Sequence, residues 1–288
     1  MRFSSLFLLS LMGIGCLVGR ADDIPVAPLP RVVLANGRMG FRLQNERLEV
    51  VVDPEAGGVV AVSHRGGTNL LRGTVHTSPI GGDLPEPEPL PLELELDSGP
   101  IPRWQARGWI TGEGTRVVML TQSFSAPVHM RVTRIVQLPA EGSRVLWSTR
   151  MTALAPTDVE RTPLTTWTPR FEDASVWTIP ADPGGMDETC GPWLRTPSLP
   201  DTPFAPQLAV ELPETLAMWR SSWELEDSGP LSAMASTRDG DILCRPVLPP
   251  DLPPQGWTLV HELTLTLHPL TEDQTACDVL RAKTARVR

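Results

Sequence analysis

The sequence predicts an all-β protein built as one large antiparallel sandwich. Apolar and polar residues alternate with a period of two along most of the chain, and helical spacing is confined to its last residues. This alternation places successive side chains on opposite faces of a half-buried strand. The 31 prolines gather in 79–102, 163–206 and 246–254, and proline removes a donor from the strand ladder. We therefore expect these three segments to be connections or sheet edges.

Two segments show the strand pattern most clearly. In 128–136, valine and methionine side chains alternate with His129, Arg131 and Thr133. In 257–267, tryptophan and leucine alternate with threonine, valine and glutamate. Residues of these types favour strands. Further strands are expected at 40–44, 48–53, 58–63, 92–96, 106–111, 115–122, 144–152, 174–178, 207–211, 216–220 and 231–236.

Glycine-rich turns separate the first strands of the sandwich. Between 48–53 and 58–63 the chain reads Asp-Pro-Glu-Ala-Gly, which is turn chemistry with proline at the second position. Gly57 and Gly58 then allow a positive φ, or the close approach of a neighbouring segment. A second turn, at residues 66–69, carries Gly-Gly-Thr-Asn.

The last residues, 271–288, are expected to form a short helix or tail. Thr271 and Gln274 have the spacing of a capping box, and Ala276, Val279 and Leu280 recur at helical spacing. The helix is expected to pack through Val279 and Leu280.

The first residues resemble an export signal. Arg2 precedes a short apolar run, and the small residues around position 20 offer a cleavage site after Ala21. Lipoprotein processing at Cys16 is the alternative, which would leave a lipid anchor. We expect a signal peptide at 1–21, a linker at 22–35 and one β domain at 36–270, in a protein that is periplasmic or extracellular.

Composition excludes several classes of function. The formal net charge is −9, so a nucleic-acid partner is not expected, because phosphate binding needs clustered cations. Cys190, Cys244 and Cys277 are widely spaced and show no metal-binding pattern, so one disulfide of unknown pairing is the expectation. No metal site, cofactor motif or later membrane span is expected.

Three segments resemble the galactose-mutarotase-like supersandwich superfamily. The stretch NERLEVVVDPEAGGVVAVSHRGGTNLL (45–71) has its opening order of strand, P-x-x-G-G turn, strand and G-x-N-L-L turn. SPIGGDLPEPEP (78–89) and the block at 131–169 are similar to an uncharacterised bacterial branch of that superfamily. The resemblance covers about residues 36–170. It implies a β-supersandwich whose concave face holds a carbohydrate.

The same resemblance argues against sugar mutarotation. Mutarotases carry a general-acid histidine in an H-P-x-F element, where this chain reads TTWTPRF (165–171) and has no histidine. Ring opening needs an acid and a base within hydrogen-bond reach of one sugar. After the Gly-Gly-Asp segment, Leu84 and Pro85 stand where that bacterial branch has a tryptophan, which puts the family pocket in doubt. No catalytic residue is therefore assigned.

Candidate ligand-binding residues come from strands and turns of this block. Trp167 could stack on a sugar and Arg170 could donate to hydroxyls or a carboxylate, unless the first is a core tryptophan and the second a surface arginine. Asp83 could accept from ligand hydroxyls or cap its own turn. Arg134 shares a face with Val132 and Val136, so it is buried and paired or lies at a pocket edge.

His261 and Glu262 complete the candidate site. They are consecutive on a strand and point to opposite faces, so His261 is either a ligand contact or a core histidine with satisfied hydrogen bonds. The favoured function is an exported, non-catalytic binder of a saccharide or similar polar small molecule. The alternatives are a carbohydrate epimerase or lyase using His129 or His261 with a glutamate, and a structural protein of the cell envelope.

Overall fold

The computed structural model describes residues 25–78, 104–124, 129–156, 164–167, 175–179, 190, 193–196, 202–204, 207–238 and 241–285. The expected signal peptide and the expected strand at 92–96 lie outside these ranges, as do Asp83 and Arg170.

The described residues form twenty strands and one helix. In chain order they are β1 (Pro25–Pro28), β2 (Arg31–Val33), β3 (Met39–Gln44), β4 (Leu48–Asp53), β5 (Gly58–His64), β6 (His76–Ser78), β7 (Gln105–Thr111), β8 (Arg116–Phe124), β9 (Met130–Leu138), β10 (Arg144–Ala153), β11 (Leu164–Trp167), β12 (Ser175–Thr178), β13 (Leu194–Thr196), β14 (Thr202–Phe204), β15 (Gln207–Leu212), β16 (Thr215–Leu225), β17 (Gly229–Leu231), β18 (Ala233–Arg238), β19 (Asp241–Pro246), β20 (Thr258–Pro269) and α1 (Ala276–Ala285).

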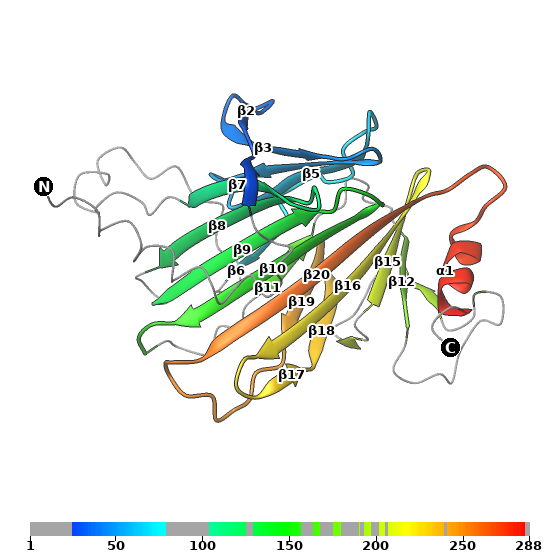
Figure 1. Ribbon diagram of the computed structural model, residues 1–288. Helices are drawn as coiled ribbons and strands as arrows, with labels where there is room; N and C mark the ends of the chain where they lie inside the picture. The colour runs from blue at the N-terminus through cyan, green and yellow to red at the C-terminus, as the bar shows by residue number, and fades with distance from the viewer. Residues whose placement is uncertain are drawn as a thin grey trace, which may run out of the picture.

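Three antiparallel sheets make up the described fold. The largest has the order β1-β7-β8-β9-β10-β20-β16-β15-β12-β13, with β17 paired to β16. A five-stranded sheet has the order β14-β18-β19-β11-β6, and a four-stranded sheet has the order β2-β3-β4-β5. In Figure 1 the long central strands cross the front of the view, with the other two sheets behind and above them. The predicted all-β antiparallel sandwich is confirmed.

Both smaller sheets pack on the same face of the large sheet, here called the inner face. Phe41 of β3 packs directly against Gly108 of β7. A Cβ added at Gly108 would lie only 2.7 Å from Cε1 of Phe41. Thr165 of β11 contacts His261 of β20, 3.2 Å from hydroxyl to ring nitrogen. The main core therefore lies between the large sheet and the two smaller ones.

Strict alternation explains how the central strands face this core. In β20 the odd-numbered residues Leu259 to Leu267 are buried. In β16, Trp219, Trp223 and Leu225 are buried as well. Burying a leucine or aromatic side chain stabilises the fold by about 1.5–3 kcal/mol each. The predicted alternation at 257–267 is confirmed, including the inward position of His261.

Helix α1 covers part of the opposite, outer face of the large sheet. Val279 and Leu280 pack there with Ala209 of β15 and Leu216 of β16. A disulfide joins Cys277 of the helix to Cys190 across 87 residues of sequence. Of the other described cysteines, Cys244 is buried and unpaired, and burial raises the pKa of its thiol to about 12.

The cap of α1 differs from the expected one. Asp278 accepts hydrogen bonds from both the backbone N–H and the hydroxyl of Thr275, at 3.0 and 2.6 Å. The Thr275 hydroxyl in turn accepts from the Asp278 N–H at 3.2 Å. Thr275 with Asp278 is thus the capping box, whereas Thr271 and Gln274 form the turn before it. The expectation that placed the capping box at Thr271 was wrong. Two threonines, four residues apart, are each followed three residues later by a side chain that can complete a capping box, and the helix begins after the second.

Several strand boundaries also differ from the expectations, and the proline-rich segment 163–206 contains β11 and β12, which lie inside their sheets and not at the edges. Residues 25–28 and 31–33, expected within a linker, form β1 on β7 and β2 on β3. The segment expected at 231–236 is split between β17 and β18. The expected strand at 216–220 continues to Leu225, since Ser221 occupies an inward position without breaking the ladder.

In the described part of the chain, no helix has the length and apolar character needed to cross a membrane.

The Cys190–Cys277 disulfide is expected to stabilise the fold substantially. Cross-linking a loop of 87 residues restricts the unfolded chain and contributes about 3–5 kcal/mol. We expect Cys277→Ser to lower the free energy of unfolding by about that amount in urea titrations. Reductant should destabilise the wild-type protein and leave the variant unchanged; equal sensitivity of the two proteins would contradict the assignment.

Candidate functional site

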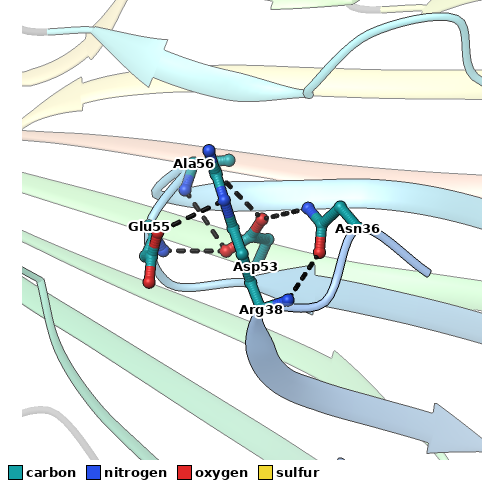
Figure 2. A network of polar contacts seen from close by, with 5 residues as sticks. All are labelled: Asn36, Arg38, Asp53, Glu55 and Ala56. Atoms are coloured by element: carbon teal, nitrogen blue, oxygen red, sulfur yellow. Dashed lines mark hydrogen bonds and ion pairs between the residues drawn. The ribbon is translucent and has the colours of Figure 1, made fainter. Parts of the chain in front are cut away.

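The glycine-rich turn between β4 and β5 is organised by one buried carboxylate. Asp53 is 1% exposed and accepts hydrogen bonds from the backbone N–H groups of Glu55 and Ala56, at 2.9 and 3.4 Å. Its second oxygen accepts from the Asn36 side-chain amide at 3.2 Å, and the Arg38 guanidinium lies 3.6 Å away (Figure 2). These contacts fix the conformation of the turn.

Gly57 ends this turn in a conformation and a space that only glycine fits. Its φ is +67°, and a Cβ built there would lie 2.7 Å from Cε2 of Trp104 and 3.0 Å from Nη1 of Arg134. The same Nη1 donates a hydrogen bond to the Gly57 carbonyl. Because glycine has no side chain, the indole and the guanidinium can approach the backbone here, and this explains the glycine at position 57.

Arg134 and Trp104 form a cation–π pair at this point. The guanidinium carbon lies 4.3 Å from the centroid of the indole, within the range of favourable cation–π contact. Arg134 is buried, and burial lowers the pKa of its guanidinium to about 9, so the group keeps its charge at neutral pH. Trp104 is half-buried and makes an edge contact with Phe124. Part of its surface remains accessible to a solute.

Arg134 begins a row of polar side chains that crosses the inner face. In register across β9, β10, β20 and β16 lie Arg134, Thr149, His261 and Trp223. Thr149 is fully buried, and its hydroxyl has no hydrogen-bond partner among the described residues. The row separates the main core from a second apolar cluster that contains Val132, Met151 and Leu259.

His261 is held on three sides within this row. Its Nε2 lies 2.8 Å from the Ser221 hydroxyl, its Nδ1 lies 3.2 Å from the Thr165 hydroxyl, and its ring stacks on Trp223 at 4.0 Å. It has no exposed surface, and burial lowers the pKa of its imidazole to about 3. The ring is therefore neutral at physiological pH and closed to solutes in this conformation.

The structure brings together three of the sequence-predicted site residues. Arg134, Trp167 and His261 all point into the layer between the sheets. Trp167 is 1% exposed and packs against Trp219, with ring centroids 4.7 Å apart, so it lies in the core. Glu262 is exposed on the outer face. The positions of Asp83 and Arg170 lie outside the described residues.

The positions of His129, His261 and Glu262 are relevant to the alternative that the protein is an enzyme with a His/Glu pair. His261 and Glu262 lie on opposite faces of β20, and His129 is exposed at the start of β9. Among the described residues, Asp53 is the carboxylate with the least exposure, and it is engaged in its turn. Neither histidine shares a cleft with a carboxylate in the described part of the chain.

Two residues of this site were missed from the sequence. Trp104 follows a proline-rich segment and belongs to no periodic pattern, so nothing in the sequence indicates its contact with Arg134. Thr149 lies at an inward parity position of β10, and its polarity there was a usable signal. Gly57 was singled out for positive φ or close approach, and the structure shows both.

No three histidine, cysteine or carboxylate side chains among the described residues lie close enough together to hold a metal ion. Chemically, the Arg134–Trp104 pair offers an aromatic face and a fixed positive charge, which suit a hydroxylated or anionic solute.

Comparison with known proteins gives a likeness of fold. No model of a known family matches the sequence, and no curated protein matches it. An α-mannosidase from Enterococcus faecalis V583 is 11% identical with a TM-score of 0.53, over 86% of this chain and 31% of that one. The chain thus spans about a third of that enzyme's length.

Galactose mutarotase-like proteins are also among the similar structures. One from Clostridium acetobutylicum is 10% identical with a TM-score of 0.47, over 85% of this chain and 99% of that one. A candidate aldose 1-epimerase from Escherichia coli K12 is 13% identical with a TM-score of 0.49, over 80% of this chain and 99% of that one.

Substitution of Gly57 tests the close approach of Trp104 and Arg134. Gly57→Ala combines a positive φ with a steric clash, whereas at Gly66 (φ +76°) nothing lies within 4 Å of an added Cβ. We expect Gly66→Ala to cost about 1 kcal/mol of unfolding free energy and Gly57→Ala at least about 2 kcal/mol more. Chemical denaturation of both variants measures the difference. Equal costs would show that the space at Gly57 is not filled as described.

The buried His261 predicts how stability depends on pH. Its pKa is about 3 in the folded protein against an ordinary value of 6.5, so between these values the unfolded chain binds a proton that the folded one does not. The unfolding free energy should therefore be unaffected above pH 6.5 and fall as pH decreases below it. From pH 7.5 to 5.0 the loss due to this group is about 2 kcal/mol.

Two histidine variants separate this effect from other titrations. His261→Gln is expected to reduce the decline between pH 7.5 and 5.0, while His129→Gln, at an exposed position, should keep the wild-type slope. Urea titrations at the two pH values measure the slopes independently of the absolute stability of each variant. A wild-type slope in His261→Gln would contradict the prediction.

Proposed function

We propose that this protein is an exported, non-catalytic saccharide-binding protein. The observation that carries the proposal is the Trp104–Arg134 pair held against Gly57. A tryptophan face packs well on the C–H surface of a sugar, and the buried guanidinium behind the ring supplies a fixed positive charge. Trp104 is the accessible member of this pair. The buried guanidinium of Arg134 packs against the indole ring and holds it in place.

The fold supports a sugar-related role. The α-mannosidase whose structure is similar carries a region of the same sandwich type, and other similar structures include galactose mutarotase-like proteins. Because one fold hosts many functions, the likeness raises the expectation of a sugar ligand and does not define which sugar.

Binding without catalysis is supported by the arrangement of the titratable groups. The general-acid histidine of mutarotases has no counterpart in TTWTPRF. His261 and Glu262 lie on opposite faces of β20, and His261 is neutral and enclosed. An acid and a base must reach the same sugar, and these residues do not provide such a pair.

Export is supported by the disulfide between Cys190 and Cys277, because such bonds persist in oxidising compartments. The signal-like residues 1–21 point the same way, with cleavage after Ala21 or lipidation at Cys16 as the two routes.

Saccharide binding is tested by titration calorimetry with a panel of neutral and acidic sugars. We expect millimolar or tighter binding by the wild-type protein and a loss of about tenfold in Trp104→Leu, since a stacked aromatic ring contributes about 1–1.5 kcal/mol. Trp109→Leu is the matched control, because Trp109 lies in β7 on the outer face. Absence of any saccharide ligand would favour the structural role in the cell envelope.

A further inference from the structure

A groove lies between the C-terminal end of β20 and helix α1. Its volume is about 200 Å³, and it is lined by His268, Pro269, Gln274, Val279, Ala282 and Lys283. The groove combines an apolar floor with three polar side chains, which is the usual composition of a small-molecule site.

Basic groups gather at this groove. Lys283 is the only lysine in the sequence, and within the described residues it makes no ion pair. The pKa of His268 is lowered to about 4 by burial, by the positive charge of Lys283 on α1 and by His64 at the end of β5. No carboxylate is among the groups that shift the pKa of His268, and the Nε2 atom of His64 is buried without a hydrogen bond in the described part of the chain.

An anion would supply the charge that this groove lacks. A carboxylate placed between Lys283 and His268 would accept a charge-assisted hydrogen bond from the ammonium group and favour protonation of the imidazole. The apolar floor of Val279 and Pro269 would then contact the body of the ligand. This favours an organic anion over a bare inorganic one, since the floor offers nothing to a hydrated ion.

We propose that this groove binds a small organic carboxylate, with the carboxylate against Lys283 and His268 and the rest of the molecule against Val279 and Pro269. The site is separate from the Trp104–Arg134 pair and does not depend on the function proposed there. A uronic acid and a simple organic acid share this chemistry.

The test uses calorimetric titration of the whole protein with glucuronate, propionate and glucose at pH 5.5. Binding of a carboxylate at a site for which glucose does not compete is expected. Binding of both acids indicates recognition of the carboxylate alone, and binding of glucuronate alone indicates that the sugar ring is also recognised. No binding of either acid at about fifty millimolar, a weak limit for a charged contact, would overturn the proposal.

Variants locate the site. Lys283→Met keeps the side-chain stem and removes the charge, and it should weaken carboxylate binding about tenfold. Lys283→Arg should retain binding, and Arg131→Met removes the same charge from an exposed position on β9 and should change nothing. Because Lys283 is exposed, none of these changes should affect folding. Unchanged binding in Lys283→Met would assign the anion to another site.

Nuclear magnetic resonance of the imidazole protons gives a second readout. Bound carboxylate should raise the pKa of His268 from about 4, because the anion favours the protonated ring. Glucose should leave that pKa unchanged. A carboxylate that binds without moving the titration of His268 would contradict the proposed placement.

Discussion

The hydrogen bond from Arg134 to the Gly57 carbonyl joins the large sheet to the four-stranded sheet, and the geometry around it depends on this bond. A buried guanidinium is costly unless its donors are satisfied and its charge is stabilised. Here the Gly57 carbonyl accepts from one N–H group of the guanidinium, and the face of Trp104 lies against its charge. The turn can do so because Asp53 fixes its conformation and glycine leaves room for the two side chains. One ionic group thus ties together a turn, a strand and an aromatic ring that are distant in sequence.

The polar row that starts at Arg134 also constrains how the sheets meet. His261 hydrogen-bonds with Ser221 on the neighbouring strand and with Thr165 on the opposite sheet. Apolar side chains pack in many ways, whereas these bonds are satisfied in only one register of β20 against β16 and β11. We infer that the row selects the register, while the tryptophans and leucines on either side supply most of the stabilisation.

The architecture could be predicted from the sequence because period-two alternation reports directly which face of a strand is buried. That rule placed His261 on the apolar face with Glu262 opposite to it, as the structure has them, and it left Arg134 either buried or at a pocket edge. It could not reveal that Arg134, Thr149 and His261 are aligned, since alignment depends on the register of strands far apart in the chain. The contact of Trp104 was unpredictable for the same reason. Trp167 was a candidate for both a site and the core, and its packing against Trp219 places it in the core.

A site built around a buried cation favours binding over proton transfer. Arg134 keeps its proton at neutral pH even though burial lowers its pKa, and the neighbouring His261 is kept neutral by the same burial. Neither group changes its protonation state in the physiological range, so neither can serve as a general acid or base there. Both are instead held rigidly, and rigid groups lose little conformational freedom when a ligand binds. The burial that lets the row hold the sheets together therefore also fixes the protonation states of Arg134 and His261 at neutral pH.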